Sequence, residues 1–350
     1  MREIKIGSQT IGDSNPPFIV AEMSGNHNQS LERALEIVEL AAQSGAHGVK
    51  LQTYTADTIT LDIDENEFHI DDPNSLWEGN SLYKLYQKAY TPWEWHEPLL
   101  KRCRELGMIG FSTPFDDTAV DFLEELEVPC HKIASFENAD IPLIKKIAST
   151  GKPVIMSTGM ATIAELDNSV RALRENGCKD IILLKCTSSY PASPENTNVR
   201  TIPHMRDLFK VQVGLSDHTM GLGCAIAAVS MGATMVEKHF TSSRADGGVD
   251  SAFSAEPHEM NALVEETERA WQSLGKVTYG ATEQEKRSLI FRRSLYVAED
   301  IKAGEKFDSR NLRVIRPGLG LEPKFYDVFL GKRATRDLKK GTPVSWDLID

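Results

Sequence analysis

The sequence has few cysteines, fewer basic than acidic residues, and no long apolar run. Its 350 residues include five cysteines, which are widely spaced and form no C-x-x-C pair, so we expect neither a disulfide framework nor a zinc knuckle. No apolar run reaches the roughly 18 residues of a membrane span, and the N-terminus lacks the apolar core of a signal peptide. The net charge of −12 argues against nucleic acid and membrane surfaces as partners. We therefore expect a globular, cytoplasmic protein.

Apolar, β-branched runs alternate with helical patterns over most of the chain. Helical patterns such as residues 31–45 and 162–177 end at a glycine, as helix C-termini often do. Eight strand–helix alternations over roughly 250 residues are typical of an α/β fold of the (β/α)8 TIM barrel type. A doubly wound sheet is the alternative. The expected strands are residues 18–23, 48–54, 109–114, 130–135, 153–159, 180–188, 211–217 and 235–240.

Two segments depart from this alternation. Residues 55–92 are too long for a plain barrel connection, and their aromatic residues favour a lid over a solvated acidic insertion. From about residue 286 onward, short strands and glycine-rich turns predict a small β-rich module. The predicted boundaries are a catalytic barrel over residues 1–275, a linker over 276–288 and the module over 289–350.

Polar side chains follow the apolar cores of the predicted strands. In a barrel these strand ends converge on one mouth, where the active site lies. Lysines and hydroxyls at such a mouth would bind a phosphate or a carboxylate, whereas a single lysine could equally be a strand residue whose ammonium reaches water. The predicted anion-binding residues are Lys50, Thr113, Lys132, Ser135, Ser157 and Ser216.

Two histidines, His218 and His239, also lie at the ends of successive predicted strands. Two imidazoles on one face would hold a divalent metal and leave positions open for substrate. Glu22 and Asp250 are candidate neighbours of this metal, and His27 is a third candidate ligand. A lone histidine on a strand is more often a satisfied core residue, so spacing alone leaves both interpretations open.

Eight short segments, taken in order, resemble the sialic acid synthase family, and the similarity covers nearly the whole chain. The C-terminal module around RPGLGL (316–321) resembles the antifreeze-like (SAF) domain of that family. The resemblance implies that phosphoenolpyruvate condenses with an open-chain amino-sugar aldehyde to give a nine-carbon 2-keto acid and phosphate. The segments are AEMSGNHN (21–28), VKLQTY (49–54), FSTPF (111–115), KIAS (132–135), STGM (157–160), CTSSYP (186–191), GLSDHT (214–219) and EKHFT (237–241).

The resemblance also implies roles for individual residues. His218 and His239 match ligands of Mn²⁺ or Mg²⁺, and Glu22 matches a carboxylate near the metal and the water. The six anion-binding residues match positions that hold phosphoenolpyruvate, and Ser188 stands where some members have an asparagine. Arg316 matches an arginine that the SAF domain extends over the barrel of a partner subunit, which implies a domain-swapped homodimer. The residues near the reacting sugar would be Gln52, Tyr190 and Asp250.

Within the family, residues 75–97, Gln29 and DSAFSAEP (250–257) look most like the pseudaminic acid synthase branch. That branch implies 2,4-diacetamido-2,4,6-trideoxy-L-altrose as the sugar. An apolar, aromatic pocket would suit a sugar that lacks a 6-hydroxyl. The aromatic residues available for such a pocket are Trp77, Tyr83, Tyr86, Trp93 and Phe253.

Three rival functions stay open. The same chemistry could act on another sugar, as in N-acetylneuraminic or legionaminic acid synthases. A Schiff-base pyruvate aldolase would use a strand lysine, for which Lys132, Lys185 and Lys238 are candidates. A protein that only binds ice or carbohydrate through its C-terminal module would need neither the histidine pair nor the lysine-rich mouth.

Overall fold

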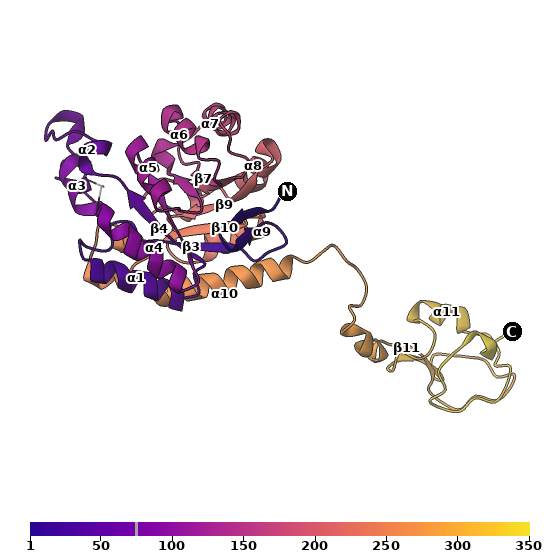
Figure 1. The fold of residues 1–350 in the computed structure, drawn as a ribbon. Coiled ribbons are helices and arrows are strands. Elements are labelled where there is room, and N and C mark those ends of the chain that lie inside the picture. The colour runs from indigo at the N-terminus through magenta and orange to yellow at the C-terminus, as the bar shows by residue number, and fades with distance from the viewer. Residues whose placement is uncertain (74–75) are drawn as a thin grey trace. The chain divides into compact units, whose positions relative to one another are not determined.

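The computed structural model describes residues 1–73 and 76–350, so Ser75, the first residue of the 75–97 stretch, lies outside the described residues. The chain divides into two compact units, Met1–Gly275 and Lys276–Asp350 (Figure 1). No helix among the described residues is long and apolar enough to cross a membrane.

The first unit is a closed barrel of eight parallel strands, as the sequence predicts. The strands follow one another around the barrel in chain order, and β10 closes the ring by pairing with β3. This closure rules out the doubly wound alternative. The strands are β3 (Phe18–Glu22), β4 (Gly48–Thr53), β5 (Ile109–Pro114), β6 (His131–Ile133), β7 (Val154–Ser157), β8 (Ile181–Cys186), β9 (Gln212–Asp217) and β10 (Met235–His239).

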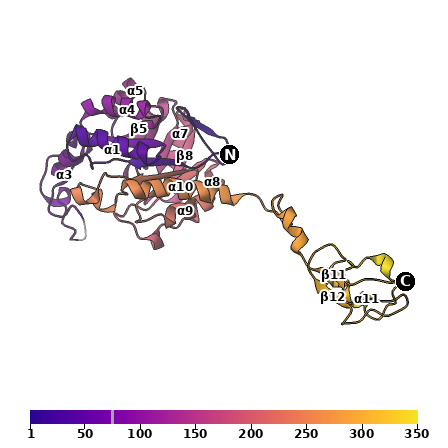
Figure 2. The same ribbon diagram turned by 90° about the horizontal axis from the view of Figure 1, so that it is seen from below.

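Helices surround the barrel (Figures 1 and 2). Helix α1 shows how the sequence defines them: Ser30 accepts a hydrogen bond from the amide of Arg33 at its start, and Gly45 adopts a φ of +80° just beyond its end. Helix α1 spans Leu31–Gln43. The other helices around the barrel are α4 (His96–Glu105), α5 (Asp117–Glu125), α6 (Ile141–Ser149), α7 (Ile163–Glu175), α8 (Thr201–Phe209), α9 (Gly223–Ser230) and α10 (Pro257–Leu274).

Two hydrophobic clusters hold the barrel together. The larger one lies between strands and helices and includes Ile37, Val38 and Leu123. The smaller one fills the barrel interior, where it includes residues of the antiparallel hairpin β1 (Ile4–Ile6) and β2 (Gln9–Ile11). Because apolar side chains fill one part of the interior, the polar residues are left at the other end, where the strands finish.

The predicted lid, residues 55–92, contains more regular structure than a plain loop. It forms α2 (Ala56–Ile59), a short 3₁₀ helix (Asn66–Phe68) and α3 (Leu82–Ala89), and His69 pairs with Ser81 in an isolated bridge. Helix α3 begins where Ser81 accepts a hydrogen bond from the amide of Lys84.

The second unit is small and has its own core. It contains a 3₁₀ segment (Glu285–Phe291), the antiparallel strands β11 (Ser294–Val297) and β12 (Leu312–Ile315), and α11 (Tyr326–Phe329). A separate hydrophobic cluster that includes Leu295, Phe307 and Phe329 fills it. Two further 3₁₀ helices (Pro323–Phe325 and Trp346–Leu348), turns and isolated bridges make up most of the remainder, which agrees with the predicted β-rich, glycine-punctuated module.

Candidate active site

A cavity of about 440 Å³ opens at the C-terminal ends of the barrel strands. It gathers most of the residues that the sequence predicts for the site, because inward-facing side chains at the strand ends converge there. The predicted residues that line it are Glu22, Lys50, Gln52, Lys132, Ser135, Ser157, Tyr190, Ser216, His218, His239 and Asp250.

The other three predicted residues do not line this cavity. Thr113 lies behind Lys50, and its Oγ1 accepts a 3.2 Å hydrogen bond from Lys50 Nζ. Oγ of Ser188 lies 3.7 Å from Sγ of Cys186, which does line the cavity. Arg316 belongs to the second unit, where it is exposed directly after β12.

Two lysines and two glutamates form a buried charge network in the cavity. Lys50 Nζ lies 2.6 Å from Glu22 and 3.9 Å from Glu237. Lys132 Nζ lies 3.5 Å from Glu237 and donates a 2.7 Å hydrogen bond to Ser157 Oγ. Because a buried ion pair contributes little net stability, ligand binding explains this network better than folding does.

Burial and neighbouring charges shift the protonation of this network. Burial raises the pKa of Glu22, although Lys50 opposes the shift. Burial also lowers the pKa of Lys132 against the attraction of Glu237. For Lys50, burial alone would lower the pKa, but Glu22 and Glu237 together raise it. The site therefore holds a firmly charged ammonium beside a carboxyl group that takes up a proton more readily than an ordinary glutamate.

His218 and His239 lie side by side, with their ring centres 5.3 Å apart. Nδ1 of His218 lies 3.0 Å from the carbonyl oxygen of Thr187 and 3.8 Å from Sγ of Cys186. Nδ1 of His239 has no hydrogen-bond partner among the described residues. Burial lowers the pKa of His239 well below its usual value, so this ring is neutral.

The histidine pair fits a divalent metal ion. A neutral imidazole with an unpaired, buried nitrogen is suited to ligation, and a carboxylate oxygen of Asp250 lies 3.7 Å from Nδ1 of His239. Another group of ligand-type side chains, Glu256, His258 and Glu259, lies at the start of α10 and outside the cavity. The cavity itself is where a metal could act on a bound substrate.

Polar groups beside the histidines and apolar groups of the lid enclose the rest of the cavity. Gln52 Nε2 donates hydrogen bonds of 2.9 Å to Glu22 and 3.2 Å to Ser24, and Ser24 donates in turn to Asp250. Nε1 of Trp77 donates a 3.1 Å hydrogen bond to a carbonyl in the loop after β10. The lid residues that line the cavity are Ile59, Ile70, Trp77, Leu82, Leu85, Tyr86 and Ala89.

Only two of the five aromatic residues expected in the sugar pocket line it. Trp77 and Tyr86 do. Tyr83 points its hydroxyl to a surface carboxylate at 2.9 Å, because it lies off the helix face that carries the cavity residues of α3. Trp93 stacks on a ring of α5 with centres 4.6 Å apart, and Phe253 packs against the histidine pair without lining the cavity.

Among the cavity residues that were not predicted as site residues, four are Ser24, Glu137, Cys186 and Glu237. Glu237 lies two residues before His239, and Ser24 lies two residues after Glu22. Side chains two residues apart on a strand point to the same face, so Glu237 is expected to face the cavity with His239, and Ser24 with Glu22. This spacing could have identified both residues from the sequence. Cys186 also ends a strand, and burial would raise the pKa of its thiol, but the hydrogen bond and charge of His218 lower it to about 6.

Glu137, the fourth, lies in a 3₁₀ segment (Ser135–Glu137) after β6. Burial raises the pKa of this carboxyl group to about 7. No strand periodicity points to it, so nothing in the sequence identified its place.

Three further candidates from the sequence have other roles. His27 does not line the cavity, and both of its ring nitrogens have hydrogen-bond partners within the protein. Nζ of Lys238 lies 2.9 Å from a carboxylate oxygen of Asp217, and neither residue lines the cavity. Lys185 binds the carbonyl of the next residue, Cys186, and also lies outside the cavity. Of the three lysines considered for a Schiff base, Lys132 alone lines the cavity.

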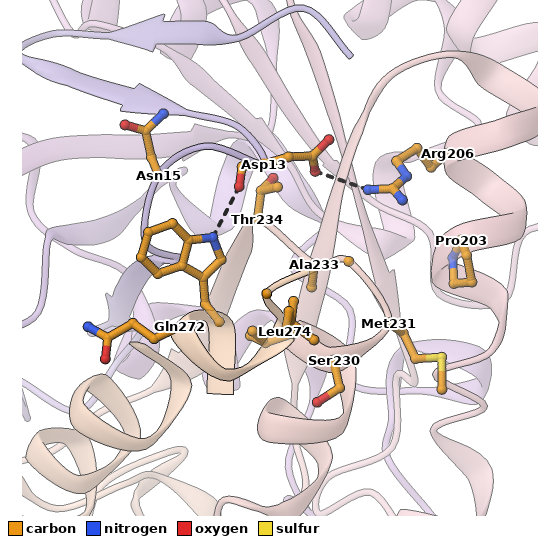
Figure 3. Close-up of a pocket in the computed structure, with 14 residues that line it drawn as sticks. Asp13, Asn15, Pro203, Arg206, Ser230, Met231, Ala233, Thr234, Gln272 and Leu274 are labelled. Carbon is orange, nitrogen blue, oxygen red and sulfur yellow. Dashed lines mark hydrogen bonds and ion pairs between the residues drawn. The ribbon is translucent and has the colours of Figure 1, made fainter. Parts of the chain in front are cut away.

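A larger cavity, of about 650 Å³, lies beside the N-terminal end of β10 and contains none of the predicted residues (Figure 3). Its acidic and basic side chains, Asp13 and Arg206, pair with each other at 3.0 Å. Trp271 donates a 3.1 Å hydrogen bond to the Asp13 carbonyl oxygen. Residues at this end of a barrel serve stability more than chemistry, so cavity size does not identify the active site.

Known proteins are similar to this chain in both fold and sequence. It is 44% identical to a pseudaminic acid synthase of Helicobacter pylori over 96% of this chain and 98% of that one. It is 36% identical to an N,N'-diacetyllegionaminic acid synthase of Campylobacter jejuni over 92% of this chain and 97% of that one. A crystal structure of an N-acetylneuraminic acid (sialic acid) synthetase from Leptospira borgpetersenii superposes with a TM-score of 0.74 at 31% identity, over 82% of this chain and 95% of that one.

The family models cover both units. Residues 37–279 match the NeuB family, and residues 292–350 match the SAF domain. The resemblance to sialic acid synthases, inferred from eight short segments, is therefore confirmed. The chain belongs to the NeuB family, and its C-terminal module is a SAF domain.

Proposed function

We propose that this protein condenses phosphoenolpyruvate with 2,4-diacetamido-2,4,6-trideoxy-L-altrose to give pseudaminic acid and phosphate by C–O cleavage. The observation that carries the proposal is that the Lys50–Lys132 pair and the His218–His239 pair share one cavity. The similarity to pseudaminic acid synthases, at 44% identity for one of them, supports the choice of sugar.

The lysines and hydroxyls would hold phosphoenolpyruvate. Lys50 and Lys132 offer ammonium groups that are already oriented, since each donates a hydrogen bond to a neighbouring hydroxyl. Groups fixed in this way need no reorganisation when charge develops on the substrate. The hydroxyl donors in the cavity that we assign to phosphoenolpyruvate are Ser135, Ser157 and Ser216. Thr113 would act by orienting Lys50, and Ser188 would act from beside Cys186.

The reaction needs one carbon–carbon bond and one water. Carbon 3 of phosphoenolpyruvate attacks the sugar aldehyde carbon, the carbonyl electron pair moves to the aldehyde oxygen, which takes up a proton, and positive character develops at carbon 2. Water adds to carbon 2 and loses a proton. The bond from carbon 2 to the phosphate oxygen then breaks, the electron pair leaves on phosphate, and the new hydroxyl loses its proton to give the ketone. Glu22, whose pKa is raised by burial, is suited to accept the proton of that water. We assign the orientation of the sugar to Gln52, Tyr190 and Asp250, which line the cavity.

We assign His218 and His239 as ligands of a divalent metal, Mn²⁺ or Mg²⁺. When bound, such a metal polarises the aldehyde oxygen as a Lewis acid. The chain itself contributes the neutral ring of His239, with its unpaired Nδ1, and Asp250 beside it.

We also propose a domain-swapped homodimer in the cytoplasm, in which residues 276–288 link the barrel (1–275) to the SAF module (289–350). Each unit contains its own hydrophobic cluster, which supports two independently folded parts. Arg316 is exposed on the SAF domain and would complete the barrel site of the partner subunit.

Phosphate release from phosphoenolpyruvate tests the proposed reaction. With Mn²⁺ or Mg²⁺, we expect release with the 2,4-diacetamido-trideoxy sugar and not with N-acetylmannosamine or the legionaminic acid precursor. Chelation should abolish the release, and added metal should restore it. Release with another sugar would keep the reaction but overturn the substrate.

Two further outcomes would overturn the chemistry itself. A heavy-oxygen label in the bridging position of phosphoenolpyruvate should stay in the phosphate, so its appearance in the keto acid or in water would contradict C–O cleavage. Failure to release phosphate with any sugar, together with inactivation by borohydride in the presence of pyruvate, would favour the Schiff-base aldolase through Lys132.

A further inference from the structure

Gln29 has a strained backbone and a side chain that the proposed reaction does not use. Its φ is +56°, in the left-handed region that residues other than glycine rarely adopt. Its Nε2 donates hydrogen bonds of 3.0 Å to the carbonyl of Lys88 and 2.7 Å to the carbonyl of Tyr90. These carbonyls lie at the C-terminal end of α3, where backbone acceptors lack partners within the helix. Gln29 therefore caps the lid helix from a separate segment of the chain.

The loop between β3 and α1 contacts this end of the lid at two more points. A Cβ atom added to Gly25 would lie only 3.1 Å from the Cα of Ala89, so the two backbones meet closely here. Nε2 of His27 lies 3.3 Å from Oγ1 of Thr91. Together with Gln29, these contacts fix the end of α3 against the barrel.

The same loop also holds the segment after β10, which brings Asp250 to the cavity. Nδ2 of Asn26 donates a 3.0 Å hydrogen bond to the carbonyl of Phe240, and Nδ2 of Asn28 donates a 3.1 Å hydrogen bond to the carbonyl of Gly247. Both carbonyls belong to the segment after β10, which leads to Asp250. A single short loop thus sets the spacing between the lid and the loop that carries Asp250.

The position of α3 decides the shape of the apolar side of the cavity. Leu82, Leu85, Tyr86 and Ala89 line the cavity from one face of this helix, since they are spaced at i, i+3, i+4 and i+7. The lysines of the cavity, Lys50 and Lys132, come from the barrel strands β4 and β6 and not from α3. The cavity therefore offers charged strand residues to phosphoenolpyruvate and the apolar face of α3 to the methyl groups of the sugar.

We propose that Gln29 is a positioning residue for the sugar: by capping α3, it fixes the apolar wall against which the deoxy end of the sugar packs. This inference rests on the proposed function. Loss of the cap would let α3 move, so part of the binding energy of the sugar would go into ordering the helix. Binding of phosphoenolpyruvate, which we assign to residues on or just after the barrel strands and not to α3, would be unaffected.

Two variants of Gln29 and one control separate this role from general stability. Gln29→Glu keeps the size and the backbone strain but places a carboxylate without donors against two carbonyls. Gln29→Gly removes the side chain and also relieves the φ of +56°. The control is Glu127→Gly, which relieves a similar φ of +54° at an exposed position just after α5.

The kinetic constants for both substrates and hydrogen exchange of the α3 amides are then measured. We expect both Gln29 variants to raise the KM for the sugar about five- to tenfold while the KM for phosphoenolpyruvate stays within about twofold, as expected for one or two lost neutral hydrogen bonds. Amides of α3 should exchange faster in both variants. Glu127→Gly should change neither KM.

The outcomes distinguish this inference from the proposed function. If wild-type protein releases no phosphate with any sugar, the proposed function fails, and unchanged hydrogen exchange in α3 would separately refute the cap. If wild-type protein is active and the sugar KM does not change, or both KM values rise together, Gln29 does not position the sugar.

Discussion

Lys238 and His239 are neighbours in the sequence but face opposite sides of the barrel wall. His239 lines the cavity, whereas Lys238 pairs with Asp217 behind it. The same alternation places Lys185 outside the cavity and Cys186 inside it. At the residue scale, then, chemistry depends on which side of a strand a side chain occupies, and this removes two of the three lysines that an aldolase could use.

Buried histidines outside the cavity predict how stability depends on pH. His96 is fully buried, with Nε2 2.8 Å from Oγ1 of Thr53, and burial lowers its pKa to about 4. The folded state holds this ring neutral, whereas the unfolded state protonates it near 6.5. The stability that it contributes is thus complete above about 6.5 and is lost as the pH falls toward 4.

His96→Gln should therefore flatten the acid side of the stability profile. Between pH 7 and 5, we expect the wild-type protein to lose about 2 kcal/mol more free energy of unfolding than the variant. Urea unfolding at both pH values measures this difference. His204→Gln, at an exposed helix position, is the control and should leave the pH dependence unchanged. Equal losses in wild type and His96→Gln would contradict the prediction.

At the scale of elements, the site depends on how closely β9 packs against its neighbours β8 and β10. Gly214 on β9 has no room for a side chain: an added Cβ would lie 2.3 Å from the Met235 carbonyl oxygen and 2.6 Å from a methyl group of Leu184. The glycine lets the strand carry Ser216 and then His218 into the cavity at this spacing. Any displacement of β9 would therefore move His218, which we assign as a metal ligand.

Gly214→Ala is expected to destabilise the barrel by about 3 kcal/mol or more, since the backbone of β10 must shift to accept the methyl group. Gly223→Ala is the matched control. An added Cβ meets nothing within 4 Å at Gly223, the first residue of α9, so that variant should be neutral or more stable by up to about 1 kcal/mol. Urea unfolding of both variants measures the effects, and equal stabilities would contradict the predicted crowding at Gly214.

At the scale of the whole molecule, two units with separate cores carry different parts of the proposed site. The barrel, Met1–Gly275, contains the metal-type histidines and the charge network. The second unit, Lys276–Asp350, contains Arg316. If Arg316 completes the site of the partner subunit, activity requires the dimer. Mixing two inactive variants, each defective in a different residue, should then restore some activity.

Arg316→Ala and His239→Ala proteins should each be inactive when alone. If Arg316 acts in the partner subunit, a mixed dimer has one intact site, so an equal mixture after subunit exchange should regain about a quarter of wild-type phosphate release. The exchange itself is followed by mass spectrometry of differently tagged chains. Exchange without regained activity would place both residues of each site in one chain.

Much of this protein can be inferred from its sequence, because the signals are local. Runs of strand-forming residues, Ser30 before α1 and Gly45 after it depend only on neighbouring residues, so the strands and most helix boundaries were predictable. Polar residues that end strands converge in any barrel, which is why the amino-acid order alone groups Lys50, Lys132, His218 and His239 at one mouth.

The tertiary structure decided what depends on contacts between distant segments. His27 accepts a hydrogen bond from the nearby amide of Gln29, but its other ring nitrogen lies 3.3 Å from Oγ1 of Thr91 in a distant segment. The two carboxylates that share Lys50 come from β3 and β10, which are neighbours only because the barrel closes. Gln29 caps a helix some 60 residues further along the chain. Local propensity cannot report these pairings, because the packing of whole elements determines them.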